Sequence, residues 1–348
     1  MFKRYFPGGL LLLMAVLLLS ACEKPVPDPT VRIAGSTMGT SYDLKLVPAP
    51  EQTVPADLKA KADALLARIN KQMSTYDPDS DLSQFNRNSS TDWIEVSPEL
   101  QQVVAEALRI SELSGGVFDI TVGPLVNLWG FGPEPRRDQV PSDAAIAKAR
   151  ERVGYWRLQS REQPPALKKE RGDIYVDLSA IAKGYGVDQL AALMETTGVA
   201  NYLVAIGGEI RAKGRNGKGQ PWTIAIEKPA PGQRAVERLI QFSDHCVSTS
   251  GNYRNFFEVQ GQRYSHVINP RTGRPVQQTL ASVTVISDRS MQADAIATAL
   301  MAAGSDFGFQ LASDHHLAAF FIVVGPDGKS FQERYTPEFE PYLLPLKP

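Results

Sequence analysis

The sequence has few cysteines and no excess of charge of either sign. Its 348 residues include two cysteines, Cys22 and Cys246. Lys and Arg number 37 and Asp and Glu 38, which gives a formal net charge of −1. Without a basic excess, nucleic acid is not expected as a partner. No internal repeat is evident, and a hydrophobic content of 43% suffices for the core of one large domain or two tightly joined ones.

The N-terminus has the features of a targeting segment. Lys3 and Arg4 precede an apolar run at residues 10–19, and small residues stand directly before Cys22. This pattern matches the bacterial lipoprotein signal, in which the cysteine is lipidated and becomes the first residue. The alternative is an ordinary signal peptide with an incidental cysteine.

On the lipoprotein interpretation, residues 1–21 are a signal peptide, Cys22 is the lipidation site and residues 22–30 form a proline-containing tether. Residues 31–348 would then be a single domain of two lobes. We expect a lipid anchor on the periplasmic side of a bacterial membrane, the inner rather than the outer one. Cys246 would be left without a disulfide partner, and its strand-like surroundings predict a buried structural thiol.

The order of predicted elements is typical of an α+β fold. Apolar periodicity and end signals predict helices over residues 55–73, 97–114, 143–153 and 291–302. Strands are expected over residues 31–47 (a pair), 117–122, 155–160, 201–206, 222–226, 237–242, 246–249, 256–259, 263–268, 282–287, 317–324 and 330–333. The strands of the second half follow one another closely, which favours antiparallel pairing.

The stretch from Asp177 to Asp188 stands out within this pattern. A β-favouring run at residues 174–178 is expected to lead directly into a helix whose N-cap is Ser179. Lys183 would lie in the first turns, and two early glycines suggest that something approaches the helix backbone closely. A phosphate site at the helix start and an ordinary strand-to-helix junction are both consistent with these residues.

Four other positions could carry chemistry. Tyr76 is the large aromatic residue of a polar loop, and His266 lies among polar residues at a strand end. Asp119 interrupts an apolar run, so its carboxylate is either paired within the protein or binds something polar. Asp294 and Thr298 share one face of an otherwise apolar helix, where their oxygens suit Mg²⁺ or Ca²⁺. The alternative is a Thr bonded to its own backbone and an Asp near a helix start.

Taken together, these stretches resemble the ApbE-type FAD:protein FMN transferases. The matching segments fall in family order at residues 35–40 (GSTMGT), 73–78 (MSTYDP), 116–126 (GVFDITVGPLV), 176–185 (VDLSAIAKGY), 203–208 (LVAIGG), 249–253 (TSGNY), 264–273 (YSHVINPRTG) and 293–300 (ADAIATAL). Each segment is weak alone, whereas the ordered set is specific. Val117, where the family often has Ala, is a conservative departure.

The resemblance implies a Mg²⁺-dependent reaction that cuts FAD at its pyrophosphate. FMN passes to a threonine hydroxyl of a target protein and AMP leaves. FAD pyrophosphatase activity and non-catalytic flavin binding are the alternatives. The implied acceptors are membrane redox proteins with a Ser/Thr-rich flavinylation motif, such as sodium-pumping or Rnf-type reductase subunits. The implied architecture is T-fold-like, with largely antiparallel sheets, packed helices and the FAD site between two lobes.

The resemblance also assigns roles to residues. FAD contacts are implied for Met38, Tyr76, Val117, Phe118, Asp119, Asp177, Lys183 and Ile268. Tyr at position 76 favours the transferase over the hydrolase. Metal ligands are implied at the side chains of Asp294 and Thr298 and at the backbone carbonyls of Ala180 and Ala297. His266 is the candidate general base for the acceptor hydroxyl, although an Asp could serve instead.

Overall fold

The computed structural model describes residues 28–134, 138–229, 236–253, 255–276, 279–328 and 330–345. The predicted signal peptide, the lipidation site Cys22 and most of the tether lie outside these residues. Within the described part of the chain, no helix combines the length and the apolar character needed to cross a membrane.

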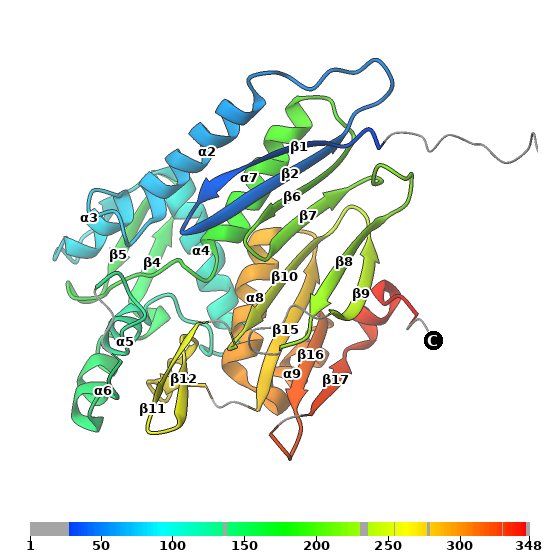
Figure 1. The fold of residues 1–348 in the computed structure, drawn as a ribbon. Helices are drawn as coiled ribbons and strands as arrows, with labels where there is room; N and C mark the ends of the chain where they lie inside the picture. Colours follow the sequence, from blue (N-terminus) through cyan, green and yellow to red (C-terminus); the bar gives the residue numbers. More distant parts are fainter. Residues whose placement is uncertain are drawn as a thin grey trace, which may run out of the picture.

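An antiparallel sheet of eight strands forms the centre of the molecule (Figure 1). Its spatial order is β1-β2-β6-β7-β10-β15-β16-β17, and every neighbouring pair is antiparallel. The bounds are β1 Val31–Thr37, β2 Thr40–Val47, β6 Asn201–Ile206, β7 Glu209–Lys213, β10 Cys246–Gly251, β15 Leu280–Ser287, β16 Ala318–Val324 and β17 Phe331–Tyr335. The α+β class with largely antiparallel sheets, predicted from the element order, is confirmed.

Helices cover one face of this sheet. Leu44 and Val204 from neighbouring strands pack into one hydrophobic cluster with α2 and α7, while Val283 and Phe321 pack into another with α4 and α8. The helices are α2 Leu58–Met73, α4 Pro98–Leu113, α7 Ala182–Thr196, α8 Ser290–Ala303 and α9 Ser305–Asp314. α4 begins as predicted, because the hydroxyl of Ser97 accepts a hydrogen bond from the backbone N–H of Leu100.

The opposite face of the sheet is covered in part by a separate hairpin. Its strands are β8 Trp222–Glu227 and β9 Val236–Phe242, and the 3₁₀ helix η2 Pro337–Tyr342 packs beside it. Residues of the central strands alternate between the two faces, so both faces bury side chains. This is why all but the last residue of β15 is buried.

A second group of elements lies beside the helical face, on the left side of Figure 1 below α2. It includes a three-stranded sheet in the order β3-β5-β4 and the two-stranded pairs β11-β12 and β13-β14. The bounds are α3 Asp81–Arg87, β3 Ile94–Glu95, α5 Gly123–Leu128, α6 Asp143–Arg150, η1 Tyr155–Arg157, β4 Leu158–Arg161, β5 Ala166–Lys169, β11 Phe256–Val259, β12 Gln262–Ser265, β13 Ile268–Asn269 and β14 Arg274–Pro275. Trp129, Phe257 and Ile268 belong to the apolar cluster of this group.

The prediction of a strand at residues 174–178 that leads into a helix capped by Ser179 is wrong. No strand forms there, and α7 begins at Ala182 with Ile181 in the N-cap position. The side-chain amide of Asn86 bonds both the N–H and the carbonyl of Val176, each at 2.8 Å. An amide from a distant segment thus takes the place of a neighbouring strand.

Residues 117–122 also differ from the prediction, because they form a turn that leads into α5 and no strand. The Ser114 hydroxyl accepts a hydrogen bond from the N–H of Phe118, and the carbonyl of Asp119 accepts one from Val122. Bonds within the turn, together with one from the N–H of Asp177 to the carbonyl of Ile120 at 2.8 Å, therefore satisfy this backbone. Two other expected strands are shorter than predicted. In the strand expected at residues 155–160, residues 155–157 are a 3₁₀ helix and β4 begins at Leu158. In the strand expected at residues 263–268, β12 ends at Ser265.

Candidate active site

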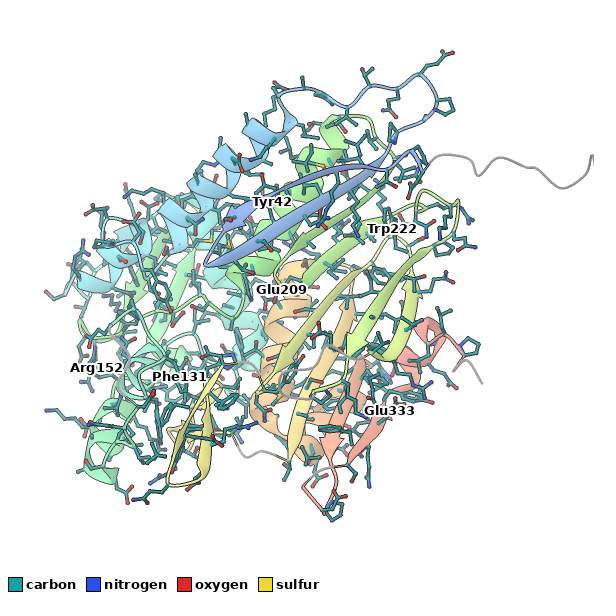
Figure 2. The ribbon with its side chains drawn as sticks, viewed as in Figure 1. Tyr42, Phe131, Arg152, Glu209, Trp222 and Glu333 are labelled. Carbon is teal, nitrogen blue, oxygen red and sulfur yellow. The ribbon has the colours of Figure 1, made fainter. Side chains whose placement is uncertain are left out.

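A cleft of about 660 Å³ opens between the central sheet and the second group of elements. Eleven predicted site residues line it: Tyr76, Val117, Phe118, Asp119, Asp177, Ala180, Lys183, His266, Ile268, Asp294 and Thr298. Figure 2 labels two further lining residues, Phe131 from the second group and Glu209 near the centre of the molecule. The cleft is large enough for most of a dinucleotide.

The two walls of the cleft differ in chemistry. Val117, Phe118, Phe131 and Ile268 supply apolar and aromatic surface on the side of the second group. Tyr76, whose side chain is 65% exposed, stands at the same cleft in the loop between α2 and α3. Such a wall suits a flat ring system.

The opposite wall carries a cluster of charged groups. The Lys183 ammonium lies 2.9 Å from Glu209 Oε1 and 3.6 Å from Asp294 Oδ1. Asp294 and Glu209 are only 3% and 4% exposed. Two carboxyl groups therefore share one ammonium at the buried side of the cleft, and when both are ionised a bound cation could balance the excess negative charge.

Burial and mutual charge set the pKa values of this cluster. Burial raises the pKa of the Asp294 carboxyl to about 7, against the opposing effect of the Lys183 charge. Burial alone would lower the pKa of Lys183, but Asp294 and Glu209 outweigh it and raise that pKa above the usual lysine value. Lys183 is therefore charged at neutral pH.

Glu209 was not predicted as a site residue. It begins β7 directly after Gly207 and Gly208, and its Oε2 also accepts the N–H of Gly208 at 3.2 Å. The available signal was an acidic residue after a Gly pair at the end of a buried strand. Its proximity to Lys183 depends on the pairing of β6 with β7 and on the position of α7.

The backbone around Lys183 is less open to a phosphate than the sequence suggested. The N–H of Ala182 donates to the carbonyl of Leu178 at 2.8 Å, and that of Gly184 donates to Asp294 Oδ2 at 3.0 Å. What approaches the two glycines of this segment is the protein itself. A Cβ on Gly184 would meet the backbone of α8, and one on Gly186 would meet Ile206 and Met38.

Two predicted ligands lie away from the cleft lining. Met38, in the β1–β2 turn, packs against both hydrophobic clusters on the helical face of the sheet. Its side chain lies close to Gly186 of α7. Ala297 is fully buried within α8. Their roles toward FAD and metal stay predictions.

Asp119 is paired within the protein, one of the two outcomes considered for it. Its Oδ1 accepts hydrogen bonds from the N–H and the hydroxyl of Thr121 at 2.7 and 2.6 Å. Its Oδ2 accepts the N–H of Tyr155 at 2.8 Å. Burial raises the pKa of this carboxyl, and the three hydrogen bonds oppose the shift. Asp119 thereby holds the turn that forms the apolar wall.

Replacing Asp119 by Asn is expected to lower the free energy of unfolding by about 1–3 kcal/mol, because an amide NH₂ would face a backbone donor in a buried site. Denaturant titration measures this loss. Asp306→Asn, at an exposed carboxylate on α9, is the matched control and should change stability by less than about 0.5 kcal/mol. Equal effects of the two substitutions would contradict the role given to Asp119.

His266 lies on the cleft with one ring nitrogen occupied. Its Nδ1 is 3.1 Å from the carbonyl oxygen of Asn255, which also accepts the backbone N–H of His266 at 3.1 Å. A carbonyl can only accept, so Nδ1 carries the proton and Nε2 is left as the basic nitrogen. Burial, together with the charge of Lys183, lowers the pKa of the imidazole below its usual value. The ring is therefore neutral at pH 7.

Comparison with known proteins identifies the family. The model of the ApbE family matches residues 38–321. The chain belongs to the ApbE family. The family assignment made from the ordered motifs is thus confirmed, and the matched segment spans both walls of the cleft.

Curated and solved relatives cover nearly the whole chain. The FAD:protein FMN transferases of Vibrio cholerae and Escherichia coli are 45% and 40% identical over 96% and 97% of this chain, and the matches cover 98% and 97% of those proteins. The solved flavin transferase ApbE from Vibrio cholerae superposes with a TM-score of 0.83 at 44% identity, over 90% of this chain and 99% of that one. The apo flavinyl transferase ApbE of Pseudomonas stutzeri gives a TM-score of 0.82 at 38% identity, over 90% and 96% of the two chains.

The described residues contain no group of three or more His, Cys, Asp and Glu side chains that could hold a metal. The predicted ligand set is not a group of this kind, because Asp294 is its single carboxylate and the other ligands are a hydroxyl and backbone carbonyls. Asp294, Thr298 and Ala180 all line the cleft and offer a carboxylate, a hydroxyl and a backbone carbonyl. All three are hard oxygen donors, which fit Mg²⁺.

Proposed function

We propose that this chain is an FAD:protein FMN transferase that requires Mg²⁺ and uses a threonine hydroxyl as acceptor. The observation that carries the proposal is the pairing of an apolar, aromatic wall with a cluster of Lys183, Glu209 and Asp294 in one cleft. The first wall suits an isoalloxazine ring, and the second suits a pyrophosphate with its cation. The names of the relatives support the same activity.

The proposed step is a transfer at phosphorus. The threonine oxygen bonds to the phosphorus of the FMN half of FAD, the bond from that phosphorus to the bridging oxygen breaks, and AMP leaves with that oxygen. His266, neutral and with Nε2 unprotonated, is the candidate to take the hydroxyl proton; an Asp of the cleft remains the alternative. Lys183, on the charged wall, would face the phosphates once a bound cation balances the charge of Asp294 and Glu209.

Asp294 and Thr298, with the carbonyl of Ala180, are the residues that would hold Mg²⁺. When bound, the ion would withdraw charge from the pyrophosphate and orient it for in-line attack. The buried position of Asp294 on α8, fixed by the N–H of Gly184, would keep this carboxylate in one orientation toward the cleft.

We further propose that the protein acts on the periplasmic side of the inner membrane, anchored through Cys22. The charged start, the apolar run and the small residues before the cysteine support this location. Acceptors would be membrane redox subunits with a Ser/Thr-rich motif that faces the same compartment.

The test is an acceptor assay with and without EDTA. Purified protein, FAD, Mg²⁺ and an acceptor domain should yield a UV-fluorescent acceptor band and equimolar AMP, and EDTA should abolish both. FMN and AMP released at the same rate without an acceptor would favour a pyrophosphatase. FAD bound without AMP release, in the presence of a competent acceptor, would refute catalysis.

The pH profile of transfer should have its acid limb below pH 6.5. His266 must be neutral to accept a proton, and its lowered pKa keeps it neutral to lower pH than an ordinary histidine. The rate should therefore be flat from pH 8 to 7 and fall at lower pH, when measured at saturating Mg²⁺ so that Asp294 stays ionised. The transfer rate of His266→Gln should be lower by about 10²–10⁴-fold, and it should no longer fall at low pH. A limb that persists in that variant would point to an Asp as the base.

A further inference from the structure

The N-termini of α7 and α8 are each capped by a carboxylate from the other helix. The residues in their own N-cap positions, Ile181 and Arg289, make no side-chain capping bond. A helix start leaves backbone N–H groups unpaired, and Ser, Thr, Asp or Asn at the N-cap usually supplies the acceptor. Here the acceptors come from 102 to 110 residues away in the chain.

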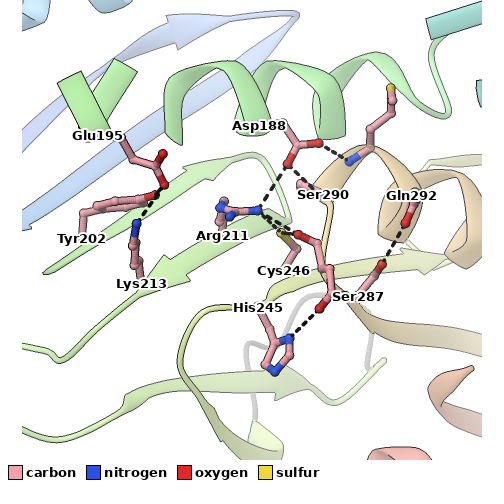
Figure 3. Close-up of polar contacts among 12 residues, drawn as sticks. Asp188, Glu195, Tyr202, Arg211, Lys213, His245, Cys246, Ser287, Ser290 and Gln292 are labelled. Carbon is pink, nitrogen blue, oxygen red and sulfur yellow. Dashed lines mark hydrogen bonds and ion pairs between the residues drawn. The ribbon is translucent and has the colours of Figure 1, made fainter. Parts of the chain in front are cut away.

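Asp188, on the second turn of α7, supplies the acceptors for α8. Its Oδ1 accepts the N–H of Ser290 at 2.8 Å and its Oδ2 accepts the N–H of Met291 at 3.0 Å. Figure 3 shows this carboxylate reaching from α7 to the first turn of α8. In return, Asp294 on α8 accepts the N–H of Gly184 on α7 at 3.0 Å. We call these three hydrogen bonds the reciprocal cap.

The two helices touch where the reciprocal cap forms. A Cβ placed on Gly184 would lie 2.3 Å from the carbonyl oxygen of Ser290 and 2.7 Å from Met291 Cα. Backbone therefore meets backbone at this point, with no side chain between them. Small changes in the spacing of α7 and α8 are transmitted directly to Lys183 and Asp294, which the two helices carry.

Arg211 on β7 supports the same arrangement from the sheet. Its Nη1 donates to the carbonyl of Asp288 at 2.8 Å, just before α8, and lies 3.9 Å from Asp188 Oδ1 (Figure 3). The guanidinium thus fixes the segment that enters α8 and offsets part of the Asp188 charge. Glu209, the partner of Lys183, lies two residues earlier on the same strand.

We propose that Asp188 is a positioning residue, which, through the reciprocal cap, sets the placement of Asp294 relative to Lys183 and so the affinity of the cleft for a divalent cation. In the described residues no hydrogen bond or ion pair joins Asp188 to either of these side chains. Its oxygens accept the backbone N–H groups of Ser290 and Met291, and the charges of Arg211 and Arg289 act on it. It acts through the position of α8. This inference rests on the proposed function, because it takes Asp294 as a ligand of the cation that serves FMN transfer.

Asp188→Asn tests the inference with little change of shape. The amide offers one acceptor, and its NH₂ would face the second N–H of α8. The affinity for Mn²⁺ alone, followed by electron paramagnetic resonance on the full chain, should fall at least tenfold, which is typical of residues that orient metal ligands. Transfer should be slower at low Mg²⁺ and partly recover at high Mg²⁺, which a merely unfolded fraction would not do.

Glu195→Gln is the matched control. Glu195 is on the same helix, and it pairs with Lys213 of β7 at 3.0 Å and accepts the hydroxyl of Tyr202 at 3.1 Å (Figure 3). The substitution removes one negative charge from α7, as Asp188→Asn does. In the described residues no hydrogen bond or ion pair joins Glu195 to α8, so Mn²⁺ affinity should stay within twofold. Asp188→Glu keeps the carboxylate, so its Mn²⁺ affinity should lie between those of Asp188→Asn and Glu195→Gln.

If Asp188→Asn does not fold, as judged by circular dichroism, the Mn²⁺ affinity of Arg211→Gln is measured instead. A loss of at least tenfold is again expected. Equal Mn²⁺ affinity in the folded variant and the unmodified protein would overturn the inference, as would an unmodified protein that binds no Mn²⁺. Absence of FMN transfer by the unmodified protein would instead count against the proposed function, because Mn²⁺ affinity is measured without FAD or acceptor.

Discussion

Replacing Asp294 by Asn is expected to lower kcat for FMN transfer on the order of 10³-fold. The carboxylate is the one charged group in the predicted metal set, and metal-assisted charge stabilisation contributes several kcal/mol, at about 1.4 kcal/mol per tenfold. Asn keeps the size of the side chain and can still accept the N–H of Gly184. The loss should therefore reflect charge and not shape.

Mg²⁺ titrations of the transfer rate check this expectation. Asp294→Asn should abolish the Mg²⁺ dependence together with the rate, while Asp306→Asn on α9 should leave both unchanged. A variant at Asp294 that keeps its rate within tenfold and the same Mg²⁺ requirement would show that the cation is held elsewhere.

Gly184→Ala is expected to destabilise the fold by about 2 kcal/mol or more and to impair transfer. The new Cβ would lie 2.3 Å from the Ser290 carbonyl oxygen, and backbone cannot move aside as a flexible side chain can. The two helices would have to separate, which moves Lys183 away from Asp294. Thermal unfolding and the transfer assay measure the two effects.

Gly186→Ala, two residues along the same helix, is the control for stability. Its Cβ would meet the ends of the Ile206 and Met38 side chains at 2.9 and 3.3 Å, which can shift. The intrinsic helix preference for Ala, about 1 kcal/mol over Gly, should offset that cost. Comparable destabilisation by both substitutions would mean that the close contact of Gly184 with the α8 backbone is not the cause of the lost stability.

Elements with a strong local signal were predicted well. α4 begins at the Ser97 cap, α8 is buried as its uniformly apolar sequence suggested, and the closing hairpin of β16 and β17 forms around residues 325–328. For α4 and the hairpin the deciding interactions lie within a few residues, and for α8 the uniformly apolar sequence itself predicts burial.

The two apolar runs at residues 117–122 and 174–178 were predicted as strands and are not. Their backbone groups bond to Ser114 and Asp119 in one case and to the amide of Asn86 in the other, and a single bond, from the N–H of Asp177 to the carbonyl of Ile120, joins the two runs. Composition favours an extended strand in both, but a strand requires a neighbour. Whether a neighbour is present is a property of the tertiary structure.

The sequence by itself determined the residue types of the site and, through the order of its motifs, the family. Lys183 and Asp294, and the tyrosine, histidine and apolar residues around them, could all be named before any fold was known. Only the tertiary structure brought Glu209 to Lys183 and capped each of α7 and α8 with a carboxylate of the other. The physical reason is that a charged or capping pair depends on distance in space, and these partners lie 26 to 110 residues apart in the chain.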